Sequence, residues 1–196
     1  MKKVIGITGG IASGKSNVCN IISNLGYVVI NCDKITNDLS EIDGPIYKAI
    51  IKEFGEEYLT FDMKLDKKKL AKYIFHDNDA KERLNSVTHP IIIDEVKRLL
   101  TLVDDGLVFV EAPLLYEAKI EDMFDKVICV FLKKKIQVER LMAREGIDED
   151  YALAKIHSQM DLYMKKELAD YVIDSKGSFD ETKSQVINII NELKGV

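Results

Sequence analysis

Tryptophan is absent from this 196-residue chain, and proline, histidine and cysteine occur only three times each. The cysteines are odd in number and form no C-x-x-C pair, which favours thiols in a reducing compartment over a disulfide framework (Cys19, Cys32 and Cys129). Together with the scattered histidines they give no zinc-binding spacing. Long apolar runs are missing too, since no segment approaches the roughly 20 residues of a membrane-spanning helix.

Two further classes are excluded by the N-terminal residues and by the charge. The apolar stretch after Lys3 is short and broken by glycines, so it does not read as a signal peptide, and we expect a cytoplasmic protein. The net charge of −5 argues against a general binder of nucleic acid or of membrane surfaces. An anionic substrate would therefore have to be held by a local cationic site. The sequence carries no signal for an oligomeric state.

The chain does have the balance of an ordinary folded protein, with 46% hydrophobic and 31% charged residues. Five apolar runs are continuous rather than alternating, as in parallel strands that are buried on both faces. They lie at 3–8, 27–30, 107–111, 127–132 and 171–173. Helical patterns separate these runs, so we predict an α/β, doubly wound fold with a five-stranded parallel sheet.

The stretch between the second and third runs is too long for one crossover helix. We predict a helix that Pro45 opens, a second that Asp66 caps, a third that leads to His89 and Pro90, and a further helix from Ile91 to Leu102. A helical insertion of this size, placed at 34–104, suits a subdomain that binds a substrate.

The most informative motif is G-x-x-x-x-G-K-S, which runs from Gly9 to Ser16 between a predicted strand and a predicted helix. This is the phosphate-binding P-loop, in which backbone N–H groups cradle phosphate oxygens. Lys15 would reach the β- and γ-phosphates, and the Ser16 hydroxyl would bind Mg²⁺. The motif therefore predicts a site for ATP or GTP, and an ordinary glycine-rich turn is the weaker interpretation.

Two carboxylates follow strands at the edge of the sheet where such sites collect. Asp33 comes just after the second strand, where it would take a proton from an acceptor hydroxyl or would merely cap the next helix. Glu111 ends the third strand, where a carboxylate often holds Mg²⁺ through water. The next loop contains Leu114 and Leu115, for which core packing is the simpler role.

A charged region at 133–167 has two interpretations. It is a solvated helical hairpin, which charge alone favours, or a lid that places basic side chains over ATP. Arg140 and Arg144 are four residues apart and share one helical face, and their guanidinium groups suit phosphate oxygens. Gln159 closes the next predicted helix of the region.

Taken in order along nearly the whole chain, these motifs resemble dephospho-CoA kinases. The P-loop is shared by many kinases, whereas His89-Pro90, the P-L-L-Y-E run and the spacing of Gln137, Arg140 and Arg144 are more specific. The matching stretches are 6–16, Asp33, 65–70 with Phe75, 84–90, 113–117, Gln137 with Arg140 and Arg144, Ile156 with Gln159, and 169–174.

The resemblance implies transfer of the γ-phosphoryl group of ATP, with Mg²⁺, to the ribose 3′-hydroxyl of dephospho-CoA, the last step of coenzyme A synthesis. It implies a P-loop kinase core (1–33, 105–132 and 168–196), a helical acceptor-binding subdomain (34–104) and a lid (133–167). The catalytic set it implies is Asp33, Lys15 and Arg140. The ATP contacts are Gly10, Ile11, Ala12, Ser13, Gly14, Lys15, Ser16, Asn17 and Arg144. The acceptor contacts are Asp33, His89, Leu114, Glu117 and Gln159.

Four positions depart from the family's usual pattern. Ala12 replaces a glycine, a change from which we expect little effect, and Asn17 replaces a threonine near the α-phosphate. Asn31 stands where an aspartate is common. Ser175 replaces an asparagine near the expected adenine pocket, so the adenine contacts are the least secure part of the comparison.

Two other functions compete with this reading. The nearer one is another P-loop kinase, acting on a nucleotide, a sugar acid or shikimate, and the long helical insertion argues against it. The other is a nucleotide-dependent switch, but the N-K-x-D guanine reader of a GTPase does not occur in the sequence.

Overall fold

The structure is a computed structural model that describes residues 2–195, and its chain divides into two compact units. The first unit takes the chain up to Ile30 and again from Asp104 onward, and the second unit is Asn31–Val103. The second unit thus begins three residues before the predicted insertion, and the segment 133–167 belongs to the first unit. That the second unit binds the acceptor, and that the segment 133–167 acts as a lid, are still predictions.

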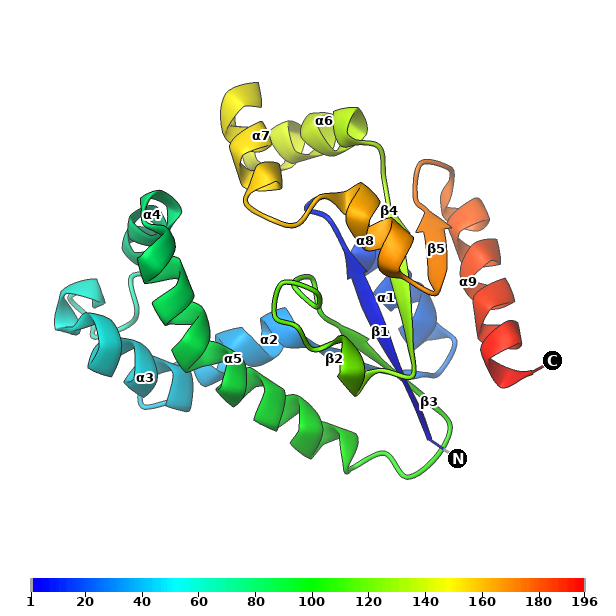
Figure 1. Ribbon diagram of the computed structural model, residues 1–196, viewed down its shortest axis with the longest axis horizontal. Coiled ribbons are helices and arrows are strands. Elements are labelled where there is room, and N and C mark those ends of the chain that lie inside the picture. The colour runs from blue at the N-terminus through cyan, green and yellow to red at the C-terminus, as the bar shows by residue number, and fades with distance from the viewer. Residues whose placement is uncertain (1, 196) are drawn as a thin grey trace. The chain divides into compact units, whose positions relative to one another are not determined.

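A five-stranded sheet in the order β2-β3-β1-β4-β5 forms the centre of the first unit (Figure 1). The strands are β1 (Lys3–Gly9), β2 (Val28–Asn31), β3 (Leu107–Glu111), β4 (Lys126–Phe131) and β5 (Tyr171–Asp174). β1 pairs in parallel with β3 and β4, and β4 pairs in parallel with β5. The five predicted strands are therefore confirmed, with ends that differ by one residue.

Helices cover both faces of this sheet. The helices of the first unit are α1 (Lys15–Asn24), α6 (Lys134–Glu145), α7 (Glu149–His157), α8 (Leu162–Leu168) and α9 (Phe179–Lys194), with a 3-10 turn at Glu121–Met123. Alternate residues of β4 point to opposite faces, as a strand requires. Ile128 and Val130 pack with the buried side chains of α1 and α9, whereas Cys129 and Phe131 pack with Leu162 of α8.

The second unit is helical and has a core of its own. Its elements are α2 (Cys32–Leu39), α3 (Pro45–Phe54), a 3-10 turn (Glu56–Tyr58), α4 (Lys67–His76) and α5 (Asn78–Leu100). Pro45 occupies the first turn of α3, and the Asp66 side chain accepts a hydrogen bond from the Lys69 backbone N–H at 2.9 Å to cap α4. Both helix starts were predicted, because proline and aspartate suit these positions.

The predicted break at His89-Pro90 is wrong, since α5 runs through Pro90 as one helix of 23 residues. Proline costs a helix one hydrogen bond but does not end it when packing holds both halves. Leu84, on one side of Pro90, and Ile91 and Ile92, on the other, pack against the same buried cluster, which includes Ile46.

Among the described residues, no helix is long and apolar enough to span a membrane.

Candidate active site

The P-loop joins β1 to α1, as its motif predicts, and its glycines are required by space and by backbone angle. A Cβ on Gly9 would lie 2.6 Å from the Val130 carbonyl oxygen, and Gly14 has φ of +92°. Ala12 also lies in the left-handed region, with φ of +57°. That conformation costs a residue with a Cβ roughly 1–2 kcal/mol, so the alanine is less neutral here than we expected from the sequence.

Polar atoms inside the loop are arranged for a ligand. The Lys15 ammonium donates to the carbonyl oxygens of Gly10 at 2.8 Å and Gly9 at 3.2 Å. Ser13 is fully buried, and its hydroxyl oxygen finds no partner among the described residues. An unpartnered hydroxyl in the loop that also holds the Lys15 ammonium fits a loop that closes on phosphate oxygens.

A cavity of about 280 Å³ adjoins the loop, and both predicted arginines line it. Its walls are the loop residues 12–16 together with Arg140 and Arg144 of α6. The Arg144 guanidinium donates to Glu145 at 2.7 Å on the exposed side of the helix. Positive charge thus surrounds a space that a loop of backbone N–H groups also faces, and such a space suits a polyphosphate.

The arginine nearer the loop is bonded to Ser175, the residue that follows β5. The Arg140 Nη2 donates to the Ser175 carbonyl oxygen at 3.1 Å, and the Ser175 hydroxyl donates to the Ser13 carbonyl oxygen at 2.5 Å. Ser175 is buried, and the Phe131 carbonyl oxygen lies 3.3 Å from the same hydroxyl as a second, weaker acceptor of its one proton. The residue that departs from the family pattern therefore braces the P-loop.

Glu111 lies where the sequence places it, at the end of β3, and it is 4% exposed. It interacts with the Cys19 thiol of α1, whose pKa is raised by burial and then by the Glu111 charge. The Lys15 charge acts on the same thiol in the opposite direction. Glu111 therefore lies close to the P-loop helix. It would contact a metal ion in the loop through a water molecule.

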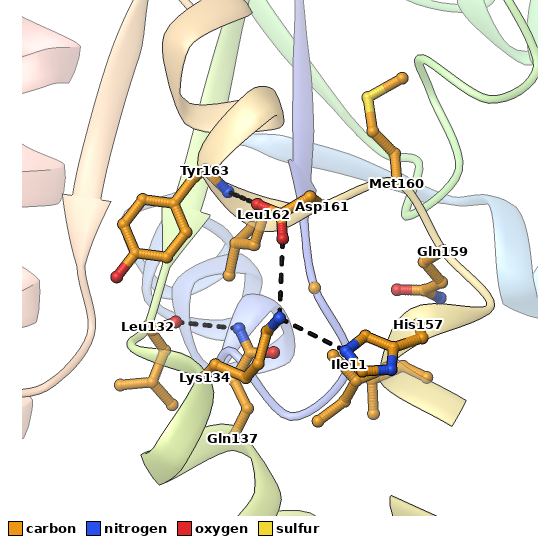
Figure 2. Close-up of a pocket in the computed structure, with 12 residues that line it drawn as sticks. Ile11, Leu132, Lys134, Gln137, His157, Gln159, Met160, Asp161, Leu162 and Tyr163 are labelled. Carbon is orange, nitrogen blue, oxygen red and sulfur yellow. Dashed lines mark hydrogen bonds and ion pairs between the residues drawn. The ribbon is translucent and has the colours of Figure 1, made fainter. Parts of the chain in front are cut away.

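The second cavity of this unit, about 150 Å³, lies between the P-loop and the segment that joins α7 to α8 (Figure 2). Gly10 and Ile11 contribute to its wall. Lys134 reaches into it from the start of α6, 3.4 Å from His157 Nε2 and 3.8 Å from the Asp161 carboxylate. Ile11 and Ala12 also pack against the α6–α7 pair, so the charged region touches the P-loop directly.

Gln137 and Gln159 form part of the same wall (Figure 2). Gln137 is buried and donates to the Leu132 carbonyl at 2.9 Å, a structural role that its motif does not reveal. We predict from the sequence that Gln159 closes this helix, but Gln159 lies two residues beyond the end of α7. Its Oε1 is buried and finds no partner among the described residues.

The two leucines of the P-L-L-Y-E loop differ in exposure. Leu115 is fully buried, as the packing interpretation expects, whereas Leu114 is 39% exposed and remains available for contact. Glu117 is occupied by its neighbours, since its Oε1 pairs with the Lys165 ammonium at 2.7 Å and accepts from the Met160 N–H at 2.9 Å. Lys165 has no exposed side-chain surface. No sequence pattern indicates this burial, because a lysine in a charged run is normally solvated.

Asp33 and His89 belong to the second unit. The side chain of Asn31, not of Asp33, caps α2, because Asn31 Oδ1 accepts from the Lys34 N–H at 2.7 Å. Asp33 is exposed in the first turn of α2 and is not used as the cap. Burial lowers the pKa of the His89 imidazole, which favours its neutral form.

Comparisons with known proteins agree on one family. The family model for dephospho-CoA kinase matches residues 3–181. A dephospho-CoA kinase from Carboxydothermus hydrogenoformans is 40% identical over 194 residues, covering 97% of this chain and 94% of its own. One from Enterococcus faecalis is 40% identical over 197 residues, covering 100% and 99%.

Solved structures give the same result. A dephospho-CoA kinase from Campylobacter jejuni has a TM-score of 0.72 at 29% identity, covering 100% of this chain and 99% of its own. A protein called TT1252 from Thermus thermophilus has a TM-score of 0.85 at 29% identity and covers 98% of both chains. A shikimate kinase from Acinetobacter baumannii, at 12% identity and a TM-score of 0.56, shares the fold alone. The chain is a kinase of the P-loop fold and belongs to the dephospho-CoA kinase family.

Proposed function

We propose that the protein transfers the γ-phosphoryl group of ATP to the ribose 3′-hydroxyl of dephospho-CoA, giving CoA and ADP. The main support for this function is the cavity lined by residues 12–16, Arg140 and Arg144. Phosphoryl transfer needs mainly positioning and the neutralisation of developing charge. Backbone N–H groups, the Lys15 ammonium and two guanidinium groups supply both at one place.

Lys15 and Arg140 have different roles in this mechanism. Lys15, now bound to the carbonyl oxygens of Gly9 and Gly10, would exchange these weak acceptors for phosphate oxygens. Arg140, held by Ser175 at the wall of the cavity, would meet the transferring group. A guanidinium placed in this way stabilises charge that develops in the transition state more than charge in the bound substrate.

The residues around the loop fit Mg²⁺. Ser16 lines the cavity, and the buried Glu111 at the end of β3 interacts with Cys19 of α1. A hydroxyl and a carboxylate are oxygen ligands of the kind Mg²⁺ takes, with waters completing the shell. When bound, Mg²⁺ would offset negative charge on the phosphate groups.

The acceptor side of the proposal rests on the second unit. This unit contains a largely apolar cavity of about 220 Å³, with Ile46, Ile50 and Leu70 in its wall. Its polar edge includes Asn37, whose Oδ1 accepts from the Lys67 ammonium at 2.7 Å. An apolar pocket with a few polar groups suits a small organic group, and we assign it to an apolar part of the non-nucleotide arm of dephospho-CoA.

Asp33 is the proposed general base. Its carboxylate is exposed at the start of α2 and is not committed to capping that helix, which Asn31 does instead. It is therefore available to take the proton of the attacking hydroxyl.

Identification of the product tests the proposal. Purified protein is incubated with Mg-ATP and dephospho-CoA, and ³¹P NMR locates the new phosphate. A monoester at the ribose 3′ position and a product that co-elutes with CoA are expected. Phosphorylation at another position, or of shikimate or a nucleoside in preference, would contradict the proposal.

A further inference from the structure

Lys165 is the one described lysine whose side chain is completely enclosed. It lies on α8, and its ammonium donates to the Pro113 carbonyl oxygen at 2.7 Å. The same ammonium pairs with Glu117 Oε1, also at 2.7 Å. Burying an ammonium is expensive, and an apolar side chain of similar length would fill this space without that cost. What an apolar side chain would not provide is directional bonding.

These bonds join three segments of the first unit. The Pro113 carbonyl that accepts from Lys165 also accepts from the Thr8 hydroxyl at 3.2 Å, at the end of the strand that leads into the P-loop. Glu117 Oε1 also accepts from the Met160 N–H at 2.9 Å. Met160 follows Gln159 in the segment between α7 and α8, where Figure 2 shows both side chains. A single ammonium thus connects the P-loop strand, the loop after β3 and the α7–α8 segment.

Two oxygen atoms on the connected segments remain without donors. Glu117 Oε2 and Gln159 Oε1 are both buried, and no donor among the described residues reaches either of them. Buried acceptors of this kind are costly unless a donor arrives. They suit a ligand that brings hydroxyl or amide N–H groups, both of which the proposed acceptor carries.

We propose that Lys165 is a positioning residue that sets these two acceptor atoms for hydroxyl or amide groups of the phosphoryl acceptor. The inference rests on the proposed function. Lys165 itself touches neither substrate. It fixes Glu117 through Oε1 and leaves Oε2 to the ligand, while the bond from Met160 to the same oxygen holds Gln159 in place.

The test separates the KM for dephospho-CoA from the affinity for ATP. Lys165→Met should raise the KM for dephospho-CoA at least about tenfold, because a charge-assisted hydrogen-bond network is lost. The Kd of an ATP analogue, measured by titration calorimetry, should change by less than about twofold. Lys166→Met is the matched control, since Lys166 neighbours Lys165 on α8 and lies over the Phe131 ring at 5.0 Å. It should match the wild type.

A second variant keeps the inference testable if Lys165→Met does not fold. Glu117→Gln retains an oxygen for Lys165 and Met160 and replaces only the second oxygen by an amide. The variant leaves the enclosed Lys165 ammonium without a counter-charge, so it should melt below the wild type; at a temperature where it is folded, it should show a raised KM for dephospho-CoA. An unchanged KM in this variant, or an equal loss of ATP affinity in Lys165→Met, would overturn the inference. Failure of the wild type to phosphorylate dephospho-CoA in the same assay would instead overturn the proposed function.

Discussion

Arg140 donates from Nη2 to the Ser175 carbonyl oxygen at 3.1 Å, and this bond fixes one wall of the P-loop cavity. Because the Ser175 hydroxyl in turn donates to the Ser13 carbonyl, the arginine and the loop are held by the same buried residue. The lid cation of the proposed mechanism is therefore placed before substrate arrives, as electrostatic catalysis requires.

Arg140→Ala should lower kcat by roughly 10²–10³ and raise the KM for ATP much less, because the contact strengthens in the transition state. Steady-state kinetics at several ATP concentrations give both constants. Arg144→Ala is the matched control on the same helix, and it should act mainly on the KM for ATP. An effect of Arg140→Ala confined to KM would contradict the role.

Asp33→Asn should lower kcat by roughly 10²–10⁴, the range for loss of a general base. ATP affinity should change little, since the side chain is assigned to the acceptor hydroxyl. Asp38→Asn, at another exposed carboxylate of α2, is the control and should behave as the wild type. A decrease in kcat of less than tenfold would mean that Asp33 is not the base.

Ser175→Ala should lower the free energy of unfolding by about 1–3 kcal/mol, because it leaves the buried Ser13 carbonyl oxygen without the hydroxyl that donates to it. Urea denaturation measures the change. Ser184→Ala, at an exposed helical serine of α9, should stay within about 0.5 kcal/mol of the wild type. Equal stability of the two variants would show that the Ser175 bonds contribute nothing.

The three thiols should differ in reactivity. Burial raises the pKa of the Cys129 thiol to about 11 and raises that of Cys19 further, whereas Cys32 is partly exposed. At pH 8 a disulfide reagent should modify Cys32 first and the other two only after unfolding, because the thiolate is the reactive form. Cys32→Ser should remove the fast phase. Persistence of that phase in the variant would contradict the assignment.

The same shifts give a pH dependence of stability. A thiol whose folded-state pKa is raised keeps its proton after the unfolded chain has released its own near pH 9.0. The unfolded state then binds fewer protons, so stability should fall as pH rises from about 9 toward 11. Cys129→Ala should reduce this slope in urea denaturation series. An identical slope in wild type and variant would argue against the shift.

Much of the fold follows from local patterns. The glycines of the P-loop, the continuous apolar strands and the helix starts at Pro45 and Asp66 each have a local physical cause, so the sequence alone predicts them. The continuity of α5 through Pro90 was missed because it depends on packing of both halves against one cluster.

The candidate site divides in the same way. Lys15, Arg140 and Arg144 were predicted from motif and spacing, and they line or face one cavity. The bracing roles of Ser175 and Lys165 were not, because each depends on contacts between residues far apart in the sequence. A lysine in a charged run reads as solvated until the fold shows that it is enclosed.

The decisive measurement is release of ADP from Mg-ATP, with and without dephospho-CoA. Adenosine, AMP and shikimate serve as parallel acceptors. We expect release that depends on dephospho-CoA, with CoA formed in equal amount. Release that needs no acceptor, or that prefers one of the other three, would contradict it.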